Sequence, residues 1–389
     1  MVATGKLSNV VLVGAGHAHV EVLRSFARDP PRGIRLTLVT RTRHAYYSGM
    51  LPGLIAGLYR PDETTIDTRP LARAAGAEIV EASAEGVDLG AQCLRCAGRP
   101  PIPYDVLSFD IGSTTDISSI SGVGERTVPV RPIDGFLQRF ESLRQRVLRS
   151  TRTTRIAVVG GGAAGVELAL SVANRLRDEV DKAAGRFDRL QFVLVCGTPD
   201  LLPDFPLSFR EKFRAILKAT GIEVVAGAIV SSVEPGRLII EGKPPVAADE
   251  TMWAIGAAAP QWLRATDLPL DRKGFISVDA DLRVTGLKNV FAAGDIASFM
   301  PRPLAKSGVY AVRQGPVIDR NIRSLLAGKP LEGYRPQRNT LYLVSTGKRH
   351  AIGTRNGIVV PGRWVWHVKD WIDRRWIGRY KAVGRPTGE

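Results

Sequence analysis

Short runs of aliphatic and β-branched residues recur along the chain, and several of them end in glycine. The runs at residues 9–13 and 154–159 lead directly into glycine-rich turns, after which apolar residues continue at helical spacing. Further runs of strand length lie at 35–39, 78–81, 93–96, 105–109, 191–195, 221–225 and 250–255, and the segment 289–295 holds another that ends in Gly-Asp. Strands that alternate with helices predict an α/β fold built on parallel sheets.

The second glycine-rich turn has the spacing of a dinucleotide-binding turn, with Gly160, Gly162 and Gly165. The first glycine permits a tight turn, the second lets backbone N–H groups reach a pyrophosphate, and the third lets the helix pack against the strand. The positive end of the helix dipole then faces the phosphates. A purely structural turn is the alternative in a chain with 40 glycines, but the strand before and the helix after favour a nucleotide site.

The N-terminal turn repeats this pattern with Gly14 and Gly16, but His19 stands where the third glycine is expected. A histidine there either holds the helix farther from the strand or presents its imidazole beside a cofactor. For His17 and His19 we favour plain packing over a chemical role, because a helix start near a phosphate can use any polar side chain. All four residues are candidate cofactor contacts.

Neither strand that follows a glycine turn ends in the acidic residue that usually binds a ribose hydroxyl. Thr40, Arg41 and Arg43 follow the first of these strands, and Cys196 follows the second. The nucleotide bound at the first turn therefore needs other evidence, and NADH and NADPH cannot be separated at the second.

Two spacings agree along the chain. Gly14 is 98 residues before Gly112, and Gly160 is 96 residues before Gly256, with a strand running into a glycine each time. This repetition predicts two copies of one nucleotide-binding unit. A later strand ends in Gly294 and Asp295, where the carboxylate can hydrogen-bond a chain of hydroxyls, although a tight turn explains a Gly-Asp pair equally well.

Other segments are expected to be connections. Residues 43–57, rich in Gly, Pro and aromatics, predict a loop that can lie against a flat ring or serve as an ordinary surface connection. Residues 122–131 predict a linker before a helix at 133–150. Cys93 and Cys96 lie in an apparent hairpin and have no second pair, so a redox or metal role is disfavoured and no metal site is expected.

The composition is that of a globular protein of two or three domains. The three cysteines, the lack of a signal-like segment and the lack of an apolar run of about 18 residues favour the cytoplasm. The net charge of +16 is unusual, and residues 301–389 hold 18 Lys and Arg against 5 Asp and Glu. The basic charge is therefore concentrated, which favours a surface with a partner.

The basic tail also holds four of the six tryptophans. A helix at 364–381 would place Val365, Val368, Ile372 and Trp376 on one face, with basic residues elsewhere. Such a helix suits the plane of a membrane interface, and equally suits packing on the rest of the protein with its long basic side chains reaching water.

Together these motifs resemble the two-dinucleotide-binding-domain flavoproteins of the pyridine nucleotide-disulfide oxidoreductase superfamily. The resemblance spans nearly the whole chain, through Gly14 and Gly16, residues 110–113, 160–167, 254–256 and 290–295. Residues 14–24, 46–53, 306–315 and 369–374 are similar to a branch of FAD-containing NADH dehydrogenase-like proteins, some of which are fused to selenophosphate synthetase.

The resemblance implies two Rossmann-like three-layer domains, one for FAD and one for NAD(P)H, and a small C-terminal region. The FAD domain would span 1–125 and 285–330, the inserted NAD(P)H domain 126–284, and the C-terminal region 331–389. Gly14, Gly16 and Asp295 would hold FAD, and Gly160, Gly162 and Gly165 would hold NAD(P)H. Further candidate cofactor contacts are His17, His19, Thr40, Arg41, Gly112, Gly256 and Gly294.

The resemblance also implies hydride transfer from NAD(P)H to the flavin. Glu167 would lie toward the nicotinamide, the loop ending at Pro52 near the flavin ring, and Lys306 where flavin and acceptor meet. Disulfide-reducing relatives carry a cysteine pair beside the flavin, which the loop at 46–57 lacks, so disulfide and sulfide chemistry are disfavoured. Type II NADH:quinone oxidoreductases carry glutamines where this chain keeps Gln314 but has Val309 and Arg313.

We therefore expect an FAD-dependent NAD(P)H dehydrogenase that passes electrons to a small acceptor such as a quinone, at the inner face of the cell membrane through 364–381. A reductase of an acidic electron-transfer protein is one alternative. A nucleotide-dependent redox sensor is another, although nucleic acid is disfavoured as its partner because no nucleic-acid-binding module is present. A homodimer stays open.

Overall fold

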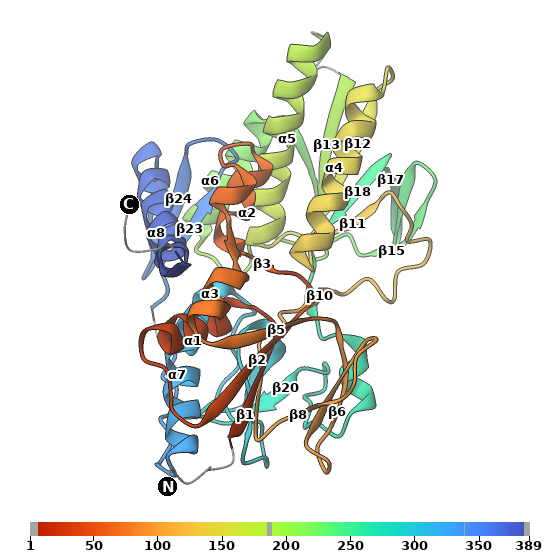
Figure 1. Ribbon diagram of the computed structural model, residues 1–389. Coiled ribbons are helices and arrows are strands. Elements are labelled where there is room, and N and C mark those ends of the chain that lie inside the picture. The colour runs from red at the N-terminus through yellow and green to blue at the C-terminus, as the bar shows by residue number, and fades with distance from the viewer. Residues whose placement is uncertain (1–6, 185–188, 338, 385–389) are drawn as a thin grey trace, which may run out of the picture.

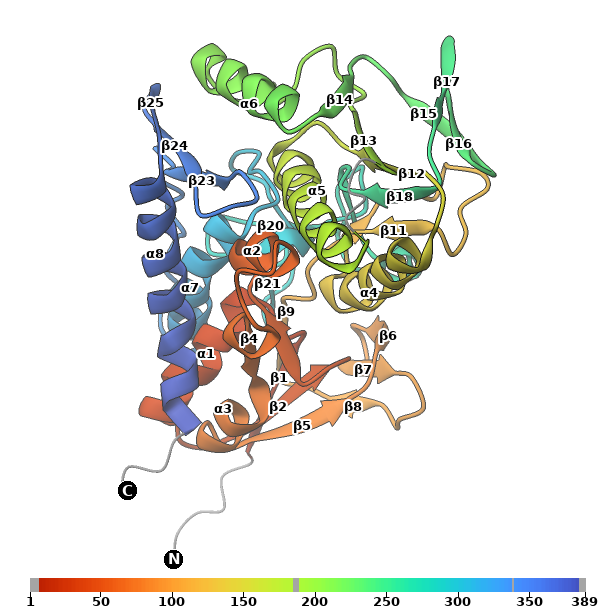
Figure 2. The same ribbon diagram turned by 90° about the horizontal axis from the view of Figure 1, so that it is seen from above.

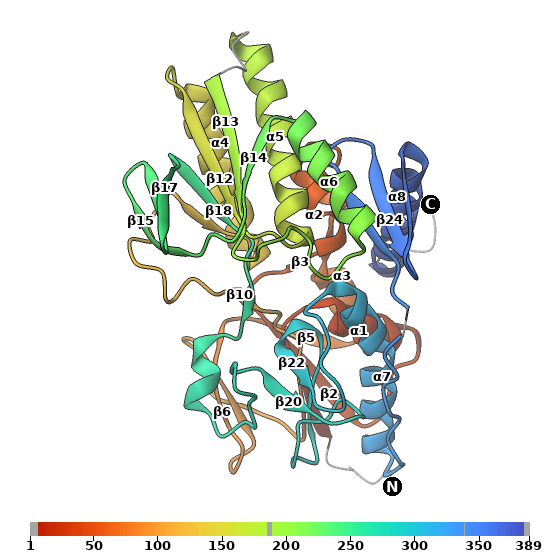
Figure 3. The same ribbon diagram turned by 180° about the vertical axis from the view of Figure 1, so that it is seen from behind.

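The computed structural model describes residues 7–184, 189–337 and 339–384. Figures 1 and 3 show two α/β halves, one above the other, each built on its own parallel sheet. A short antiparallel pair, β10 (Thr114–Thr115) with β19 (Ala257–Ala258), lies at the junction between them. A C-terminal region packs along one side of both halves.

The first sheet has the order β21-β9-β1-β2-β5, and all of its strands are parallel. Its strands are β1 (Ser8–Val13), β2 (Ile34–Thr40), β5 (Ala77–Glu81), β9 (Val106–Phe109) and β21 (Val290–Ala292). The central strand is apolar on both faces, with residues 10–13 at most 1% exposed, because helices cover the sheet. Those helices include α1 (His17–Arg28), α3 (Thr68–Ala74) and α7 (Gly308–Leu326), and α1 and α7 lie side by side.

The second sheet has the order β11-β18-β12-β13-β14, again all parallel. Its strands are β11 (Thr127–Pro129), β12 (Thr154–Val159), β13 (Leu190–Val195), β14 (Ile222–Val225) and β18 (Glu250–Trp253). Its helices are α4 (Ile133–Arg149), α5 (Ala163–Ala184) and α6 (Leu207–Ala219). The expectation of a linker at 122–131 was wrong for its end, because β11 pairs with β18 as an edge strand.

The predicted repeat is confirmed by the topology. In the first half the strand before the glycine turn, β1, lies between β9 and β2. In the second half the corresponding strand, β12, lies between β18 and β13. Each half also carries a three-stranded antiparallel sheet at the same point of its sequence, directly before β9 in the first half and before β18 in the second. These are β6 (Ala84–Asp88), β7 (Cys93–Cys96) and β8 (Ile102–Pro103), and β15 (Val230–Glu234), β16 (Arg237–Ile240) and β17 (Lys243–Ala247). The α/β fold of two Rossmann-like units is therefore as predicted.

The first half is discontinuous in sequence. Strand β21 pairs with β9 although more than 180 residues separate them, and β20 (Ile276–Val278) and β22 (Ala297–Phe299) pair beside it. This strand order is what an inserted nucleotide domain requires. We propose that the domains divide after residues 125, 284 and 330.

The segment at 43–57 is more regular than a loop. It contains β3 (His44–Tyr46), which pairs with β4 (Thr65–Asp67), and then a short helix, α2 (Leu51–Ile55). Met50, Leu54 and Ile55 are buried, so their apolar side chains stabilise this structure, which the Gly- and Pro-rich composition did not indicate.

The C-terminal region is an antiparallel sheet followed by one long helix. The sheet contains β23 (Tyr342–Ser345), β24 (Ala351–Arg355) and β25 (Ile358–Gly362), and the helix is α8 (Arg363–Lys381). Figure 2 shows α8 running beside α1 along the outside of the molecule. The described part of the chain contains no helix that is both long and apolar enough to cross a membrane.

The predicted helix is present, but its predicted apolar face was wrong. Val365 and the partly buried Trp376 face the protein, whereas Val368 and Ile372 are 38% and 36% exposed. The buried face instead includes Trp366, Asp373, Ile377 and Tyr380.

Candidate functional site

A cavity of about 430 Å³ opens where the strands of the first sheet end. Parallel sheets bind ligands at this edge, where the chain turns from strand to helix. Residues of the second half, from 131–134, complete its wall. Of the residues predicted from the sequence, the cavity is lined by Gly14, Gly16, His17, Thr40, Arg41, Gly112, Gly294, Asp295 and Lys306.

The glycines of the first turn are required by a close approach of the backbone. Gly14 has φ +88°, and a Cβ there would lie 2.4 Å from the carbonyl oxygen of Asp110. A Cβ on Gly16 would lie 2.3 Å from the Asp110 carboxyl group. Substitution at either position would therefore displace the strand end that forms the floor of the cavity.

Asp110 is a buried acid that was not among the candidate site residues, although residues 110–113 carry part of the resemblance. Its carboxylate accepts hydrogen bonds from the backbone N–H groups of Ala18 (2.7 Å) and His19 (3.0 Å), at the start of α1. Burial raises the pKa of Asp110 to about 7, against the effect of these two hydrogen bonds. An acidic residue directly after a largely apolar strand was the available signal.

His19 lies outside the lining of the cavity. Its Nδ1 is 2.7 Å from the carbonyl oxygen of Gly14, and its Nε2 is 2.8 Å from Oγ of Ser108. Burial lowers the pKa of His19 to about 4, so the ring is neutral and can donate to Gly14 while accepting from Ser108. The imidazole thus bridges the glycine turn and β9, at the position where the third glycine of the usual motif would stand.

His17, by contrast, lines the cavity. Its Nε2 is buried and has no hydrogen-bond partner among the described residues. Burial also lowers its pKa to about 4, and its ring meets Tyr47 edge-on at 5.4 Å. An unpaired buried nitrogen facing a cavity fits a polar ligand such as FAD, which would supply the missing partner.

Lys306 and Asp295 lie on the same wall. The Lys306 Nζ donates to the carbonyl oxygen of Ala297 at 2.6 Å and lies 3.8 Å from the ring centre of Phe275. Burial lowers the pKa of Lys306 to about 8, while Asp295 opposes this shift. The Asp295 carboxylate accepts from Oγ of Ser113 at 3.2 Å.

The second glycine turn lies outside this cavity. Gly160 has φ +132°, and a Cβ there would lie 2.3 Å from the carbonyl oxygen of Ala254. A Cβ on Gly165 would lie 1.9 Å from the Gly160 carbonyl oxygen, so the third glycine is needed for helix packing. Gly162 and Gly256 are exposed, and a Cβ on either would have no described atom within 4 Å outside its chain neighbours, so the turn has room for a nucleotide.

Glu167 lies beside the C-terminal region. Its Oε1 accepts from the backbone N–H of Ser345 at 2.6 Å. Loss of water contact raises the pKa of Glu167 to about 7, and Lys369 of α8 opposes the shift. Lys369 in turn pairs with Asp373 at 2.6 Å, and Asp373 accepts from the hydroxyl of Tyr47 at 3.1 Å. Lys369, Asp373 and Tyr47 are thus joined directly, whereas Glu167 interacts with Lys369 through its charge alone; we call these four groups the α8 proton cluster.

Pro52 and Gln314 are not among the residues that line the cavity. Pro52 is the second residue of α2 and is partly buried. Gln314 is buried in α7, where its Oε1 accepts from the backbone N–H of Gly294 at 2.7 Å. Gln314 therefore holds the turn before Asp295 in place. Cys93 and Cys96 are free and lie on β7.

These features define a flavoprotein oxidoreductase with two dinucleotide-binding units. Residues 8–315 match the pyridine nucleotide-disulphide oxidoreductases, and the chain belongs to that family. It is therefore an FAD-dependent oxidoreductase of reduced nicotinamide nucleotide, with FAD and NAD(P)H as its cofactors. The residues that surround the cavity fit FAD, because the glycine turn, Asp295 and the unpaired His17 face one space.

Relatives extend over nearly the whole chain. The type II NADH:quinone oxidoreductase of Staphylococcus aureus (strain NCTC 8325 / PS 47) is 22% identical over 391 residues, which cover 96% of each protein. Among solved structures, NDH2 from Plasmodium falciparum in complex with NADH has a TM-score of 0.83 at 16% identity, covering 98% of this chain and 100% of that one. The sulfide:quinone oxidoreductase of Aquifex aeolicus has a TM-score of 0.79 at 18% identity, covering 97% and 92%. At these identities the structural likeness supports the fold.

Proposed function

We propose that the protein is an NADH dehydrogenase that passes electrons to a quinone at a membrane surface. Bound FAD would accept a hydride from the nicotinamide and release electrons to the acceptor. The residues that line the cavity would bind and orient the FAD, and Gly160, Gly162 and Gly165 would bind the nicotinamide nucleotide. The names of the relatives, a type II NADH:quinone oxidoreductase and an NDH2 in complex with NADH, support this proposal.

One observation carries the membrane part of the proposal. Apolar side chains stay exposed along the outward face of α8 and the adjacent β25, which we call the outer strip. Its residues, with exposed fractions, are Ile358 (69%), Val360 (36%), Trp364 (59%), Val368 (38%), Trp371 (61%) and Ile372 (36%). Exposed basic residues of the same helix flank it, at Arg363, Arg375 and Arg379. Tryptophans beside basic residues favour the interface of an anionic membrane.

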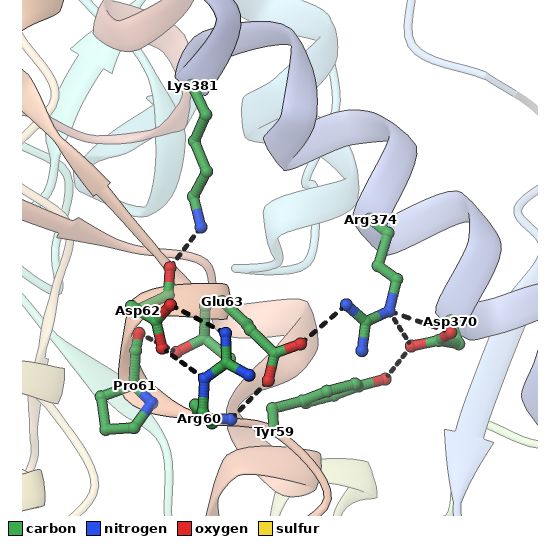
Figure 4. Close-up of polar contacts among 9 residues, drawn as sticks. Tyr59, Arg60, Pro61, Asp62, Glu63, Asp370, Arg374 and Lys381 are labelled. Carbon is green, nitrogen blue, oxygen red and sulfur yellow. Dashed lines mark hydrogen bonds and ion pairs between the residues drawn. The ribbon is translucent and has the colours of Figure 1, made fainter.

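The opposite face of α8 is held firmly to the first half, as Figure 4 shows. The Tyr59 hydroxyl donates to Asp370 at 2.7 Å, and Arg374 pairs with Glu63 at 2.9 Å. Lys381 also donates to the backbone carbonyl of Asp62. The packing interpretation of the tail therefore holds for this face of α8, and we propose the membrane interpretation for the outer strip, which the packed face keeps in position.

The α8 proton cluster supports a quinone as the acceptor. Reduction of a quinone to a quinol consumes two protons as well as two electrons. Glu167, with a pKa of about 7, exchanges a proton near neutral pH, and Lys369 and Asp373 continue the set toward Tyr47. The helix that would lie on the membrane thus carries protonatable groups on its inner side.

The test is binding to vesicles followed by turnover. We expect the protein to float with vesicles of anionic phospholipid, and Trp364→Ser with Trp371→Ser to abolish flotation. Turnover with a long-chain quinone in vesicles should fall at least tenfold in this double variant, whereas turnover with a water-soluble quinone should stay within about twofold, because only docking is lost. The control is Leu207→Ser with Met300→Ser, which removes two equally exposed apolar side chains elsewhere.

Other outcomes would separate the alternatives. Without flotation, rapid and salt-sensitive reduction of an acidic electron-transfer protein would favour the reductase. A dimer in solution that dissociates in the tryptophan double variant would assign the outer strip to a second copy of the chain. Failure of both NADH and NADPH to reduce the bound flavin would favour the sensor.

A further inference from the structure

The end of strand β2 lacks a group that the cofactor needs. The adenosine ribose of a dinucleotide bound at a glycine turn lies at the end of the second strand, where a carboxylate usually receives its hydroxyls. Here Thr40 ends β2, and its Oγ1 already donates to the carbonyl oxygen of Thr42 at 2.9 Å. Arg41 follows and cannot accept a hydrogen bond. The ribose hydroxyls, which are donors, therefore have no acceptor from this strand comparable to a carboxylate.

Three carboxylates line the cavity in the described part of the chain. Asp110 is committed to the N–H groups of α1, and Asp295 accepts from Ser113 and lies 3.8 Å from Arg131. The third, Asp134, stands apart from both. Its Oδ1 is 3.4 Å from the guanidinium of Arg41, which places it beside the end of β2.

Asp134 comes from the other half of the molecule. It is the second residue of α4, the first helix of the second half, and its side chain is 30% exposed. The contact with Arg41 is long and leaves Oδ2 without a hydrogen-bond donor among the described residues. Tyr46 lies close enough that the Asp134 charge contributes, after burial, to a raised Tyr46 pKa. Arg41, Tyr46 and Asp134 thus surround one end of the cavity.

We propose that Asp134 receives the hydroxyls of the adenosine ribose of FAD, in place of the acid missing after β2. A carboxylate accepts two hydroxyls at once, and the neighbouring Arg41 helps to orient it. The inserted domain would thereby supply a specificity-determining residue to the cofactor of the domain it interrupts. This assignment concerns the cofactor site and is independent of the electron acceptor.

The experiment compares two flavins on protein freed of its cofactor. One is FAD, and the other is an FAD analogue that lacks both hydroxyls of the adenosine ribose. Dissociation constants come from quenching of flavin fluorescence. We expect wild-type protein to bind the analogue roughly 10- to 100-fold more weakly than FAD, since hydrogen bonds to a charged group are lost. Asp134→Ala should bind FAD as weakly as it binds the analogue.

The control is Asp178→Asn, which removes an exposed carboxylate from α5 outside the cavity and should leave both constants unchanged. Equal binding of the two flavins by wild-type protein would overturn the proposal without recourse to any variant. A loss in Asp134→Ala that is equally large for FAD and for the analogue would overturn it as well, because the carboxylate would then act elsewhere.

Discussion

Single buried acids carry much of the chemistry of this molecule. Asp110 and Glu167 have pKa values of about 7 for the same physical reason, because each carboxyl group has lost most of its contact with water. Their neighbours differ, since Asp110 faces the start of α1 and Glu167 faces the C-terminal region. We therefore expect pH to act on stability through one and on turnover through the other.

The pKa of Asp110 makes the stability of the flavin-free protein depend on pH. The folded state holds the proton up to about pH 7, whereas the unfolded chain releases it near the ordinary value of 3.8. Between these values the folded state binds more protons, so its unfolding free energy falls as pH rises, by about 1.4 kcal/mol per unit at most, and levels off above pH 7. Asp110→Asn should remove this component. The measurement is thermal unfolding of the wild type and of Asp110→Asn at pH 5 and pH 8. An equal change in melting temperature between the two pH values in both proteins would contradict the prediction.

Glu167 should impose a pH dependence on quinone reduction. Its protonated form can deliver a proton, and that form is lost as pH rises through about 7. Turnover should therefore decline above neutral pH in the wild type, and Glu167→Gln should be at least tenfold slower and flat across this range. Reduction of the flavin by NADH, followed in stopped flow, should change less than about twofold. If that step slows as much as turnover, Glu167 acts on the nicotinamide instead.

At the scale of elements, α8 makes both exposed and buried polar contacts with the rest of the protein. Arg374 makes exposed ion pairs, with its side chain 45% exposed, whereas its neighbour Asp373 is buried and joins Lys369 to Tyr47. Exposed pairs contribute up to about 1 kcal/mol, and breaking a buried pair costs about 3–5 kcal/mol because a charge is left without a partner.

Adjacent substitutions on this helix should thus differ sharply. Arg374→Ala should lower the unfolding free energy by about 1 kcal/mol or less, and Asp373→Ala by about 3 kcal/mol or more. Thermal unfolding of the holoenzyme gives the comparison, and both proteins should retain bound flavin. Equal losses of unfolding free energy in the two variants would mean that Asp373 is as accessible to water as Arg374.

The face of α8 illustrates what sequence could not decide. Val365 and Trp376 face inward while Val368 and Ile372 face outward, although all four fit one helical stripe. Apolar residues occur around most of this helix, so the inward side is set by its partners, such as Tyr47 stacked on Trp376 at 4.2 Å. Those partners lie more than 300 residues away and leave no local signal. The strand–turn–helix units, by contrast, were predictable because glycine spacing and apolar runs are local.

The whole molecule shows the same division between local and distant information. The repeat, the two parallel sheets and the glycine turns follow from patterns within about 100 residues, and the structure confirms the fold that they predict. The cavity depends on pieces that no local pattern connects, since residues 131–134 of the second half complete a wall formed by the ends of β1 and β2 and by Gly294 and Asp295. The proximity of Asp134 to Arg41 and the pairing of Gln314 with Gly294 were therefore invisible in the sequence.

The discontinuity of the first sheet also orders events during synthesis. The second half is one uninterrupted stretch, and all five strands of its sheet have emerged once β18 leaves the ribosome. The first sheet must wait for β21, which is translated more than 180 residues after its neighbour β9. At about 5–20 residues per second, this delay is roughly 10–40 seconds. The later half thus has time to fold first, while β9 keeps an open edge until its partner arrives.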